Sequence, residues 1–239
     1  MPASKKTATL KLATFPRTCS ARACDKAILI AYTAHGAADA LLAAYEVMRH
    51  QRGRPRGMTT DSEQDLLRSM LVMAAAGLDA TVKQLVQDTL EQLVPIDAKA
   101  QNSFEKFVLR RLSGDAGTGA ALNNRLLASV LVSGNPQKRL LEEYVGHLTA
   151  GSLQSVDSLF EVAAALGAEP GQIGLLPTEL KPIFEMRNKI IHELDIHLGA
   201  RRRTRTVRSQ TTMIQSTERI FQLAHAMIAS VDKRLSSSK

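Results

Sequence analysis

Aromatic residues are scarce in this chain. They make up 4% of its 239 residues, and tryptophan is absent. Glycine and proline are also sparse, with 14 and 8 copies. Because aromatic residues favour strands, and glycine and proline interrupt helices, this usage together with the frequent Ala-Leu runs favours helices. Leu, Ala, Ile, Val and Met must then supply the core, so we expect an all-α fold.

Cysteine is nearly absent too, since Cys19 and Cys24 are the only two copies. Two thiols cannot close a structural zinc site, and the chain has no convincing metal or cofactor motif. We therefore expect no metal, no cofactor and a reduced thiol pair, with a redox pair as the alternative. No apolar run reaches the length of a membrane span. The expected location is cytoplasmic, without a membrane partner.

The charge is unbalanced towards positive, with 31 Lys and Arg against 23 Asp and Glu, a net charge of +8. Such a balance favours polyanionic partners such as RNA through counterion release, although a solvated basic surface is the alternative. The first 24 residues contain five basic residues and no acid. They predict a basic flexible tail, with a short strand around residues 9–15 as an alternative.

Apolar residues recur at helical spacing through most of the chain. Thr60 precedes a first turn that contains acids, which is typical of a helix N-terminus, and Pro95 ends the same pattern. The pattern predicts helices over residues 25–49, 61–94, 97–113, 120–132, 136–149, 155–166, 178–198 and 211–235. We expect three parts: the tail at 1–24, an N-terminal helix with an arginine-rich loop at 25–57, and a helical domain at 58–239 with a helical insertion at about 115–170.

The run from Arg187 to Asp195 contains the most informative pattern, Arg187-Asn188-x-x-x-His192-Glu193-x-Asp195. Arginine fits phosphate oxygens, and histidine exchanges protons near neutral pH. On a helical wheel Arg187 lies in the middle of the apolar side, where a charge is costly without a partner. His192 lies on the other side, near Asn188. The alternatives are an arginine whose head reaches water or an acid, and a surface histidine paired with Asp195 or Glu193.

This pattern resembles the signature of the HEPN superfamily, and residues 66–80 are similar to the first long helix of a bacterial group related to the RiboL-PSP-HEPN family. The resemblance implies an up-down helical bundle with extra helices that dimerises through the motif helix. It also implies metal-independent cleavage of RNA at a composite site, with Arg187, Asn188 and His192 catalytic. The members paired with nucleotidyltransferase antitoxins have a Tyr two residues after the His, where this chain has Leu194.

The resemblance further implies a toxin or phage-defence role, in which a cognate antitoxin or a defence-system partner is possible. Two arginine-rich loops and two acids are the candidate substrate contacts, although solvated loops and an ordinary helix acid are the alternatives. These residues are Arg52, Arg54, Arg201, Arg202, Arg203, Arg205, Asp79 and Glu193. A rival hypothesis is a non-catalytic HEPN-like dimer that binds RNA or a nucleotide. A second is a structural bundle whose basic loops contact DNA or a protein.

Overall fold

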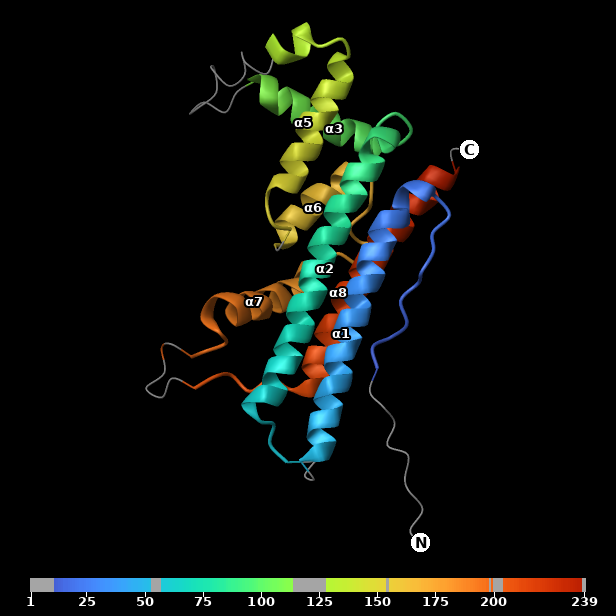
Figure 1. Cartoon of the computed structure of the whole chain (residues 1–239). Coiled ribbons are helices and arrows are strands. Elements are labelled where there is room, and N and C mark those ends of the chain that lie inside the picture. Colours follow the sequence, from blue (N-terminus) through green and yellow to red (C-terminus); the bar gives the residue numbers. More distant parts are fainter. Residues whose placement is uncertain are drawn as a thin grey trace.

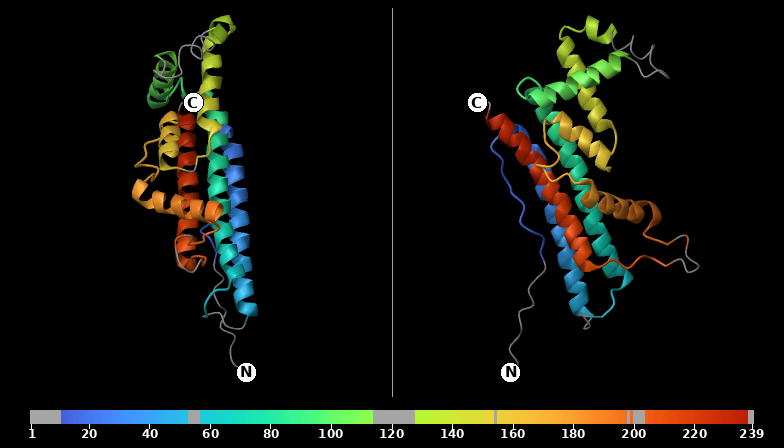
Figure 2. Two further views of the ribbon diagram at one scale, coloured as in Figure 1. Left: turned by 90° about the vertical axis from the view of Figure 1, so that its left-hand side faces the viewer. Right: turned by 180° about the vertical axis from the view of Figure 1, so that it is seen from behind.

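The computed structural model describes residues 11–52, 57–113, 128–153, 155–197, 199 and 204–237. Every named element in them is helical, and the described residues contain no strand beyond one isolated β-bridge. The expected all-α class is therefore confirmed. Three long helices, α1 (Asp25–Gln51), α2 (Asp61–Leu93) and α8 (Gln210–Ser237), lie side by side, with α1 antiparallel to the other two (Figures 1 and 2).

Helix α2 is the centre of this bundle and begins where the sequence predicts. The Thr60 hydroxyl accepts a hydrogen bond from the Glu63 backbone N–H, and the Glu63 carboxylate accepts one from the Thr60 N–H. This reciprocal capping box satisfies two N–H groups at the helix start. Residues on most sides of α2 are buried, because it packs against both α1 and α8. Helix α1, which the sequence assigns to a part separate from 58–239, shares the same core.

Two of these helices also have the length and apolar composition of membrane spans. They are Arg22–Gln51 and α2, and in each of them part of the most apolar stretch is buried inside the bundle, 33% and 56% respectively. Core helices of a bundle have the same composition, because an apolar face must be covered on several sides.

The helices α1 and α2 come close together at Gly77. A Cβ atom added at Gly77 would lie 2.4 Å from the Cβ of Ala34. Real Cβ atoms do not come this close, so only glycine permits this separation of the two helix axes. Gly77, which interrupts the apolar pattern of α2 in the sequence, is therefore a packing residue.

A smaller lobe is built on the end of α2 from α3 (Ala98–Ser113), α5 (Pro136–Ala150) and α6 (Val156–Ala165) (Figure 1). Phe107 stacks on Tyr144 at 4.6 Å between ring centroids, which joins α3 to α5. The lobe includes α3, which precedes the insertion predicted at about 115–170, and Asp97 accepts hydrogen bonds from two N–H groups at the start of this helix. Of the helix predicted at 120–132, only residues 128–132 lie within the described residues, and these are helical.

Residues 11–24 pack along α1 and α8 instead of forming part of a flexible tail. Leu12 is buried, and its N–H donates to Asp39 of α1 at 3.0 Å. Two carboxylates of α8, Glu218 and Asp232, accept further backbone N–H groups of this segment. The Phe15 ring lies 6.0 Å from that of Phe221 and edge-on to it. The segment ends in a short 3-10 turn, Arg22–Cys24, that leads into α1.

Candidate functional site

The motif run lies on α7 (Pro177–Glu193), which projects sideways from the bundle and packs against α2 and α6 (Figures 1 and 2). Proline at the first helical position is favourable, because its missing N–H would have no partner inside the helix. The apolar side of α7 faces the bundle through Ile183, Phe184 and Ile190. The side that carries Lys181 and Glu185 is exposed. The motif residues are therefore set on an amphipathic helix at the edge of the core.

Arg187 lies on the inner side of α7, as the helical wheel predicts, and is 7% exposed. Its Nη1 donates to the Asn188 Oδ1 at 2.9 Å. Burial lowers the pKa of Arg187 because it disfavours the charged form, and the negative charge of Asp79 opposes this effect. A buried arginine next to an acid is also what a purely structural role requires, so both interpretations of Arg187 share this geometry.

Asp79, on α2, is thus placed near Arg187, as its assignment to the same candidate site requires. Its carboxylate is already occupied: Oδ1 accepts the Leu153 N–H at 2.6 Å, and Oδ2 accepts from the Lys83 Nζ at 2.9 Å. Asp79 therefore joins the loop after α5 to α2 in addition to contributing negative charge near Arg187.

His192 lies in the last turn of α7 and is exposed, as is Glu193 at the end of the helix. The five residues from Arg187 to His192 correspond to a rise of about 7.5 Å and a rotation of about 140° on an ideal helix. The two side chains therefore point in divergent directions within one chain. Asn188, one turn before His192 on the same side, is half-buried.

The helix ends at Glu193 instead of continuing to residue 198 as predicted. Leu194 and Asp195 both adopt left-handed backbone angles, with φ of 50° and 59°. Such a conformation is unfavourable by about 1–2 kcal/mol for each non-glycine residue, so other contacts must hold it. Asp195 supplies them: it is 2% exposed and accepts hydrogen bonds from the Arg68 Nε at 3.1 Å and the Arg208 Nε at 2.9 Å.

Burial alone would raise the pKa of Asp195, but the hydrogen bonds from Arg208 and Arg68 outweigh burial and hold it below its ordinary value. The carboxylate is therefore ionised and committed to these arginines. The alternative in which His192 pairs with Asp195 is wrong, because Asp195 points inward and His192 is exposed.

After α7 the chain doubles back, so that residues 194–197 and 204–208 lie antiparallel through the Ile196–Arg205 bridge. We call these two segments the hairpin base. Thr206 donates its N–H to the Asp195 carbonyl oxygen at 2.8 Å, and the His197 N–H donates to the Thr204 oxygen at 3.1 Å. The hairpin base thus begins directly at the end of the motif helix.

Three residues in the first turns of α2, Gln64, Asp65 and Arg68, hold the hairpin base, and we call them the clamp. Gln64 both donates to the Arg208 carbonyl oxygen at 3.0 Å and accepts the Arg208 N–H at 2.7 Å. Asp65 pairs with the Arg205 Nη2 at 2.6 Å. The clamp therefore fixes the returning segment along its length.

The basic residues predicted to contact substrate are partly engaged within the chain. The Arg52 Nε lies 3.3 Å from the buried Glu63 carboxylate. Arg205 donates to the Leu194 carbonyl oxygen at 3.1 Å besides pairing with Asp65, and the hydrogen bond that it donates to the Asp65 carboxylate raises the pKa of Arg205. Both arginines therefore have structural contacts that an RNA phosphate would have to displace or share. Arg54, Arg201, Arg202 and Arg203 lie outside the described residues.

Arg68 and Gln64 belong to no motif that can be recognised in the sequence. Arg68 carried a signal: it stands between Leu67 and Met70 on the apolar side of α2, the same anomaly that drew attention to Arg187. Its partner, 127 positions away, could not be identified from that signal.

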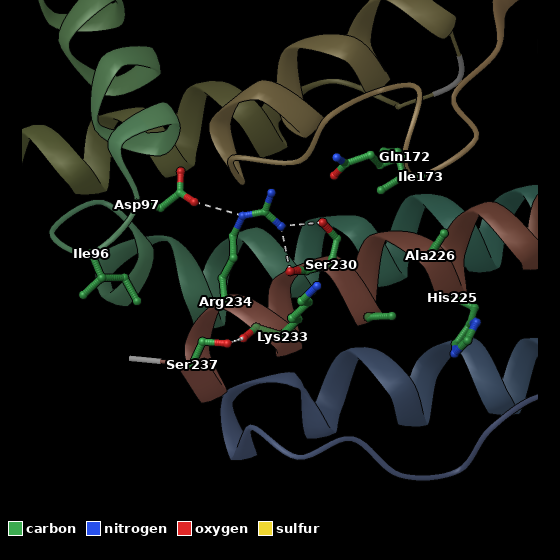
Figure 3. Close-up of a pocket in the computed structure, with 11 residues that line it drawn as sticks. Ile96, Asp97, Gln172, Ile173, His225, Ala226, Ser230, Lys233, Arg234 and Ser237 are labelled. Carbon is green, nitrogen blue, oxygen red and sulfur yellow. Dashed lines mark hydrogen bonds and ion pairs between the residues drawn. The ribbon is translucent and has the colours of Figure 1, made fainter. Parts of the chain in front are cut away.

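A cavity of about 730 Å³ lies along the C-terminal half of α8 and contains none of the motif residues in its lining. Figure 3 shows Arg234 among the residues that line it, with its Nε donating to Asp97 at 2.9 Å and its Nη1 donating to the Ser230 oxygens. The Arg234 pair joins α8 to the start of the lobe. It is the same kind of arginine–carboxylate contact as that of Asp195, at a different place in the fold.

Among the residues that the structure describes, no three His, Cys, Asp or Glu side chains come together as metal ligands would. No family model matches the chain, and no match is found among curated proteins or solved structures.

Proposed function

We propose that this protein is a metal-independent endoribonuclease of the HEPN type, which cleaves RNA at a composite site formed by two copies of the chain. The observation that carries the proposal is the pairing, on one edge helix, of a buried Arg187 with an exposed His192 five residues later. Arginine supplies fixed positive charge, and histidine supplies proton transfer near neutral pH.

The divergence of these two side chains on α7 supports a site that needs two copies. A rotation of about 140° between them keeps Arg187 and His192 of one chain from approaching the same phosphate from the same side. Two copies that meet at the exposed C-terminal end of α7 would bring the His192 of one copy towards the half-buried Asn188 of the other, which is hydrogen-bonded to Arg187. The exposed apolar side chains Ile191 and Leu194, 37% and 62% accessible, lie at this end of α7 and suit such a contact.

In the proposed reaction, one His192 removes the proton from an RNA 2′-hydroxyl, and the 2′-oxygen attacks the adjacent phosphorus. The bond from phosphorus to the 5′-oxygen breaks, and the protonated His192 of the second copy donates a proton to the leaving oxygen. Arg187 stabilises the charge that builds up on the phosphoryl oxygens, with Asn188 orienting it through their hydrogen bond. The products are a 2′,3′-cyclic phosphate and a 5′-hydroxyl. A toxin or phage-defence role is part of this proposal.

The test is cleavage of total RNA and transfer RNA in EDTA by the parent, Arg187→Ala and His192→Ala. His50→Ala is the matched control, because His50 is also an exposed histidine in the last turn of its helix. We expect the parent and the control to cleave and to leave 2′,3′-cyclic phosphate ends, and both motif variants to lose activity by a factor of about 100 or more. Cleavage by His192→Ala at the parent's rate would overturn the proposal.

A non-catalytic dimer that binds RNA or a nucleotide is the second candidate. It is favoured by one specific observation, that Arg187 is 7% exposed and already donates to Asn188. For such a protein, neither the parent nor His192→Ala cuts RNA, and both retain it equally on a filter at low salt. Loss of retention on raising the salt concentration would show that phosphate contacts dominate the binding.

A further inference from the structure

The end of α7 is held by an unusual arrangement that the proposed reaction does not use. Two consecutive non-glycine residues, Leu194 and Asp195, are in the left-handed region, directly after the turn that contains His192. Strained backbone of this kind persists only where surrounding contacts determine it, and it concentrates at functional sites. In this case the side chains of Arg68 and Arg208 both donate to one buried carboxylate, that of Asp195.

Arg68 is the residue that joins the two sides of this arrangement. Its Nε donates to the Asp195 Oδ2 at 3.1 Å, and its Nη2 donates to the Thr206 carbonyl oxygen at 2.7 Å. Arg68 is 3% exposed and Asp195 is 2% exposed, so water cannot readily replace either bond. A single side chain of α2 therefore fixes both the end of the motif helix and the returning segment of the hairpin base.

We propose that Arg68 and Asp195 are positioning residues that hold the last turn of α7 and the hairpin base in one fixed relation. RNA bound against the hairpin base then presents its phosphate at a constant distance from His192, three residues before Asp195 in the sequence. This inference rests on the proposed nuclease. It adds two residues that touch neither the RNA nor the reacting atoms and that act through the backbone of α7.

The location of the pair distinguishes this role from general support of the core. Arg68 and Asp195 lie where α7 and the hairpin base meet the first turns of α2, and the Arg68 bonds to Asp195 and to Thr206 both end on the hairpin base. The Arg234–Asp97 pair supplies the matched case, because it joins α8 to the lobe through the same chemistry near the C-terminal end of α8, whereas Arg208 lies just before the N-terminal end of that helix (Figure 3).

The experiment compares the parent with Asp195→Asn and Arg68→Lys, using Asp97→Asn as the control. Cleavage of a short RNA is measured in EDTA as kcat and KM, and backbone hydrogen exchange is measured on the same proteins. Asn keeps the shape of the Asp195 side chain and removes its charge. Lys keeps the charge of Arg68 but cannot reach Asp195 and Thr206 together.

We expect Asp195→Asn to lower kcat by about 100-fold with little change in KM, because a displacement of about 1 Å has that effect on a positioned group. The kcat of Arg68→Lys should lie between those of Asp195→Asn and the parent, and Asp97→Asn should keep the parent's kcat. The N–H groups of Asp195 and Thr206 should exchange faster in Asp195→Asn, with the core amides of α2 unchanged.

Two results would overturn the inference: unchanged exchange at Asp195 and Thr206 in the variants, or a kcat that falls equally in Asp195→Asn and Asp97→Asn. A parent protein that cleaves no RNA would instead overturn the nuclease, and the catalytic part of this inference with it. The exchange data would still decide separately whether Arg68 and Asp195 position the end of α7.

Discussion

Replacing Gly77 by alanine tests the close contact between α1 and α2 on which the bundle is built. The new Cβ would lie 2.4 Å from the Cβ of Ala34, whereas carbon atoms in contact are separated by about 3.5–4.0 Å. The Ala34 methyl group is fixed to its own helix and cannot rotate away. The two helices must therefore separate by roughly 1 Å or more, and the packing around them must adjust.

The size of the effect follows from two opposing contributions. Alanine is favoured over glycine inside a helix by about 1 kcal/mol, and forcing an extra methyl group into a packed core is unfavourable by about 1–3 kcal/mol. Because the obstructing atom belongs to a helix, we take the upper end of that range. The Gly77→Ala protein should then be less stable than the parent by about 2 kcal/mol.

Gly36→Ala is the matched control, since Gly36 lies in α1 and an added Cβ there meets nothing within 4 Å. It should stabilise the protein by about 1 kcal/mol, because only helix propensity changes. Urea unfolding followed by circular dichroism measures both variants. In the double variant Gly77→Ala with Ala34→Gly the clash is removed, so the two changes should couple favourably by about 2–3 kcal/mol. A Gly77→Ala protein as stable as Gly36→Ala would refute this account of the contact.

Three further predictions concern other described groups. The arginine partners of Asp195 hold its pKa below the ordinary 3.8 despite burial, so its stabilisation is complete above pH 3.8 and is lost as the pH falls through the lowered value. Acid unfolding should therefore be steeper for the parent than for Asp195→Asn, and equal slopes would contradict this. Burial raises the pKa of Cys19 to about 11 and of Cys24 to about 12, so little of either thiol is in the reactive thiolate form at pH 8. Iodoacetamide at pH 8 should therefore alkylate these cysteines far more slowly in the folded protein than in the urea-unfolded protein, and mass spectrometry can follow the reaction. Phe15→Ala should lower the free energy of unfolding, measured by urea unfolding, by about 2 kcal/mol, because the ring is half-buried among aromatic neighbours. An effect near zero would mean that the segment before α1 adds no stability.

Local patterns in the sequence are sufficient to predict most of the helices and the inward position of Arg187. The capping box at Thr60 depends on residues three positions apart, and the burial of Arg187 follows from the apolar residues around it on one helix. Both properties are determined within a few turns of chain. For this reason the sequence predicted where α2 begins and which side of α7 faces the core.

The end of α7 could not be predicted in the same way, because it is determined by a distant partner. Leu194 and Asp195 have no helix-breaking side chain, and the turn depends on Arg68 and Arg208 reaching one carboxylate. The same reason applies to Arg205, whose partner Asp65 lies far away in the sequence. A helical wheel or a count of charges shows that such residues are charged, but it does not identify the residue of opposite charge with which each of them pairs.

The docking of residues 11–24 was missed for a different physical reason. Its backbone N–H groups bind carboxylates of α1 and α8, and such bonds leave no pattern in the residues that donate them. The apolar residues Leu12 and Phe15 are the only indication in the sequence that this segment packs on the bundle, and the basic residues around them are typical of a flexible tail.

The contacts between this N-terminal segment and α8 have a consequence for synthesis of the protein. The hydrogen bond from Ala13 to Glu218 spans 205 positions, and that from Ser20 to Asp232 spans 212. Synthesis runs from the N-terminus, so residues 11–24 are made long before α8 and cannot form these contacts until α8 has been made. The N-terminal segment therefore takes its native place late in folding, because its contacts are among the most distant in the sequence.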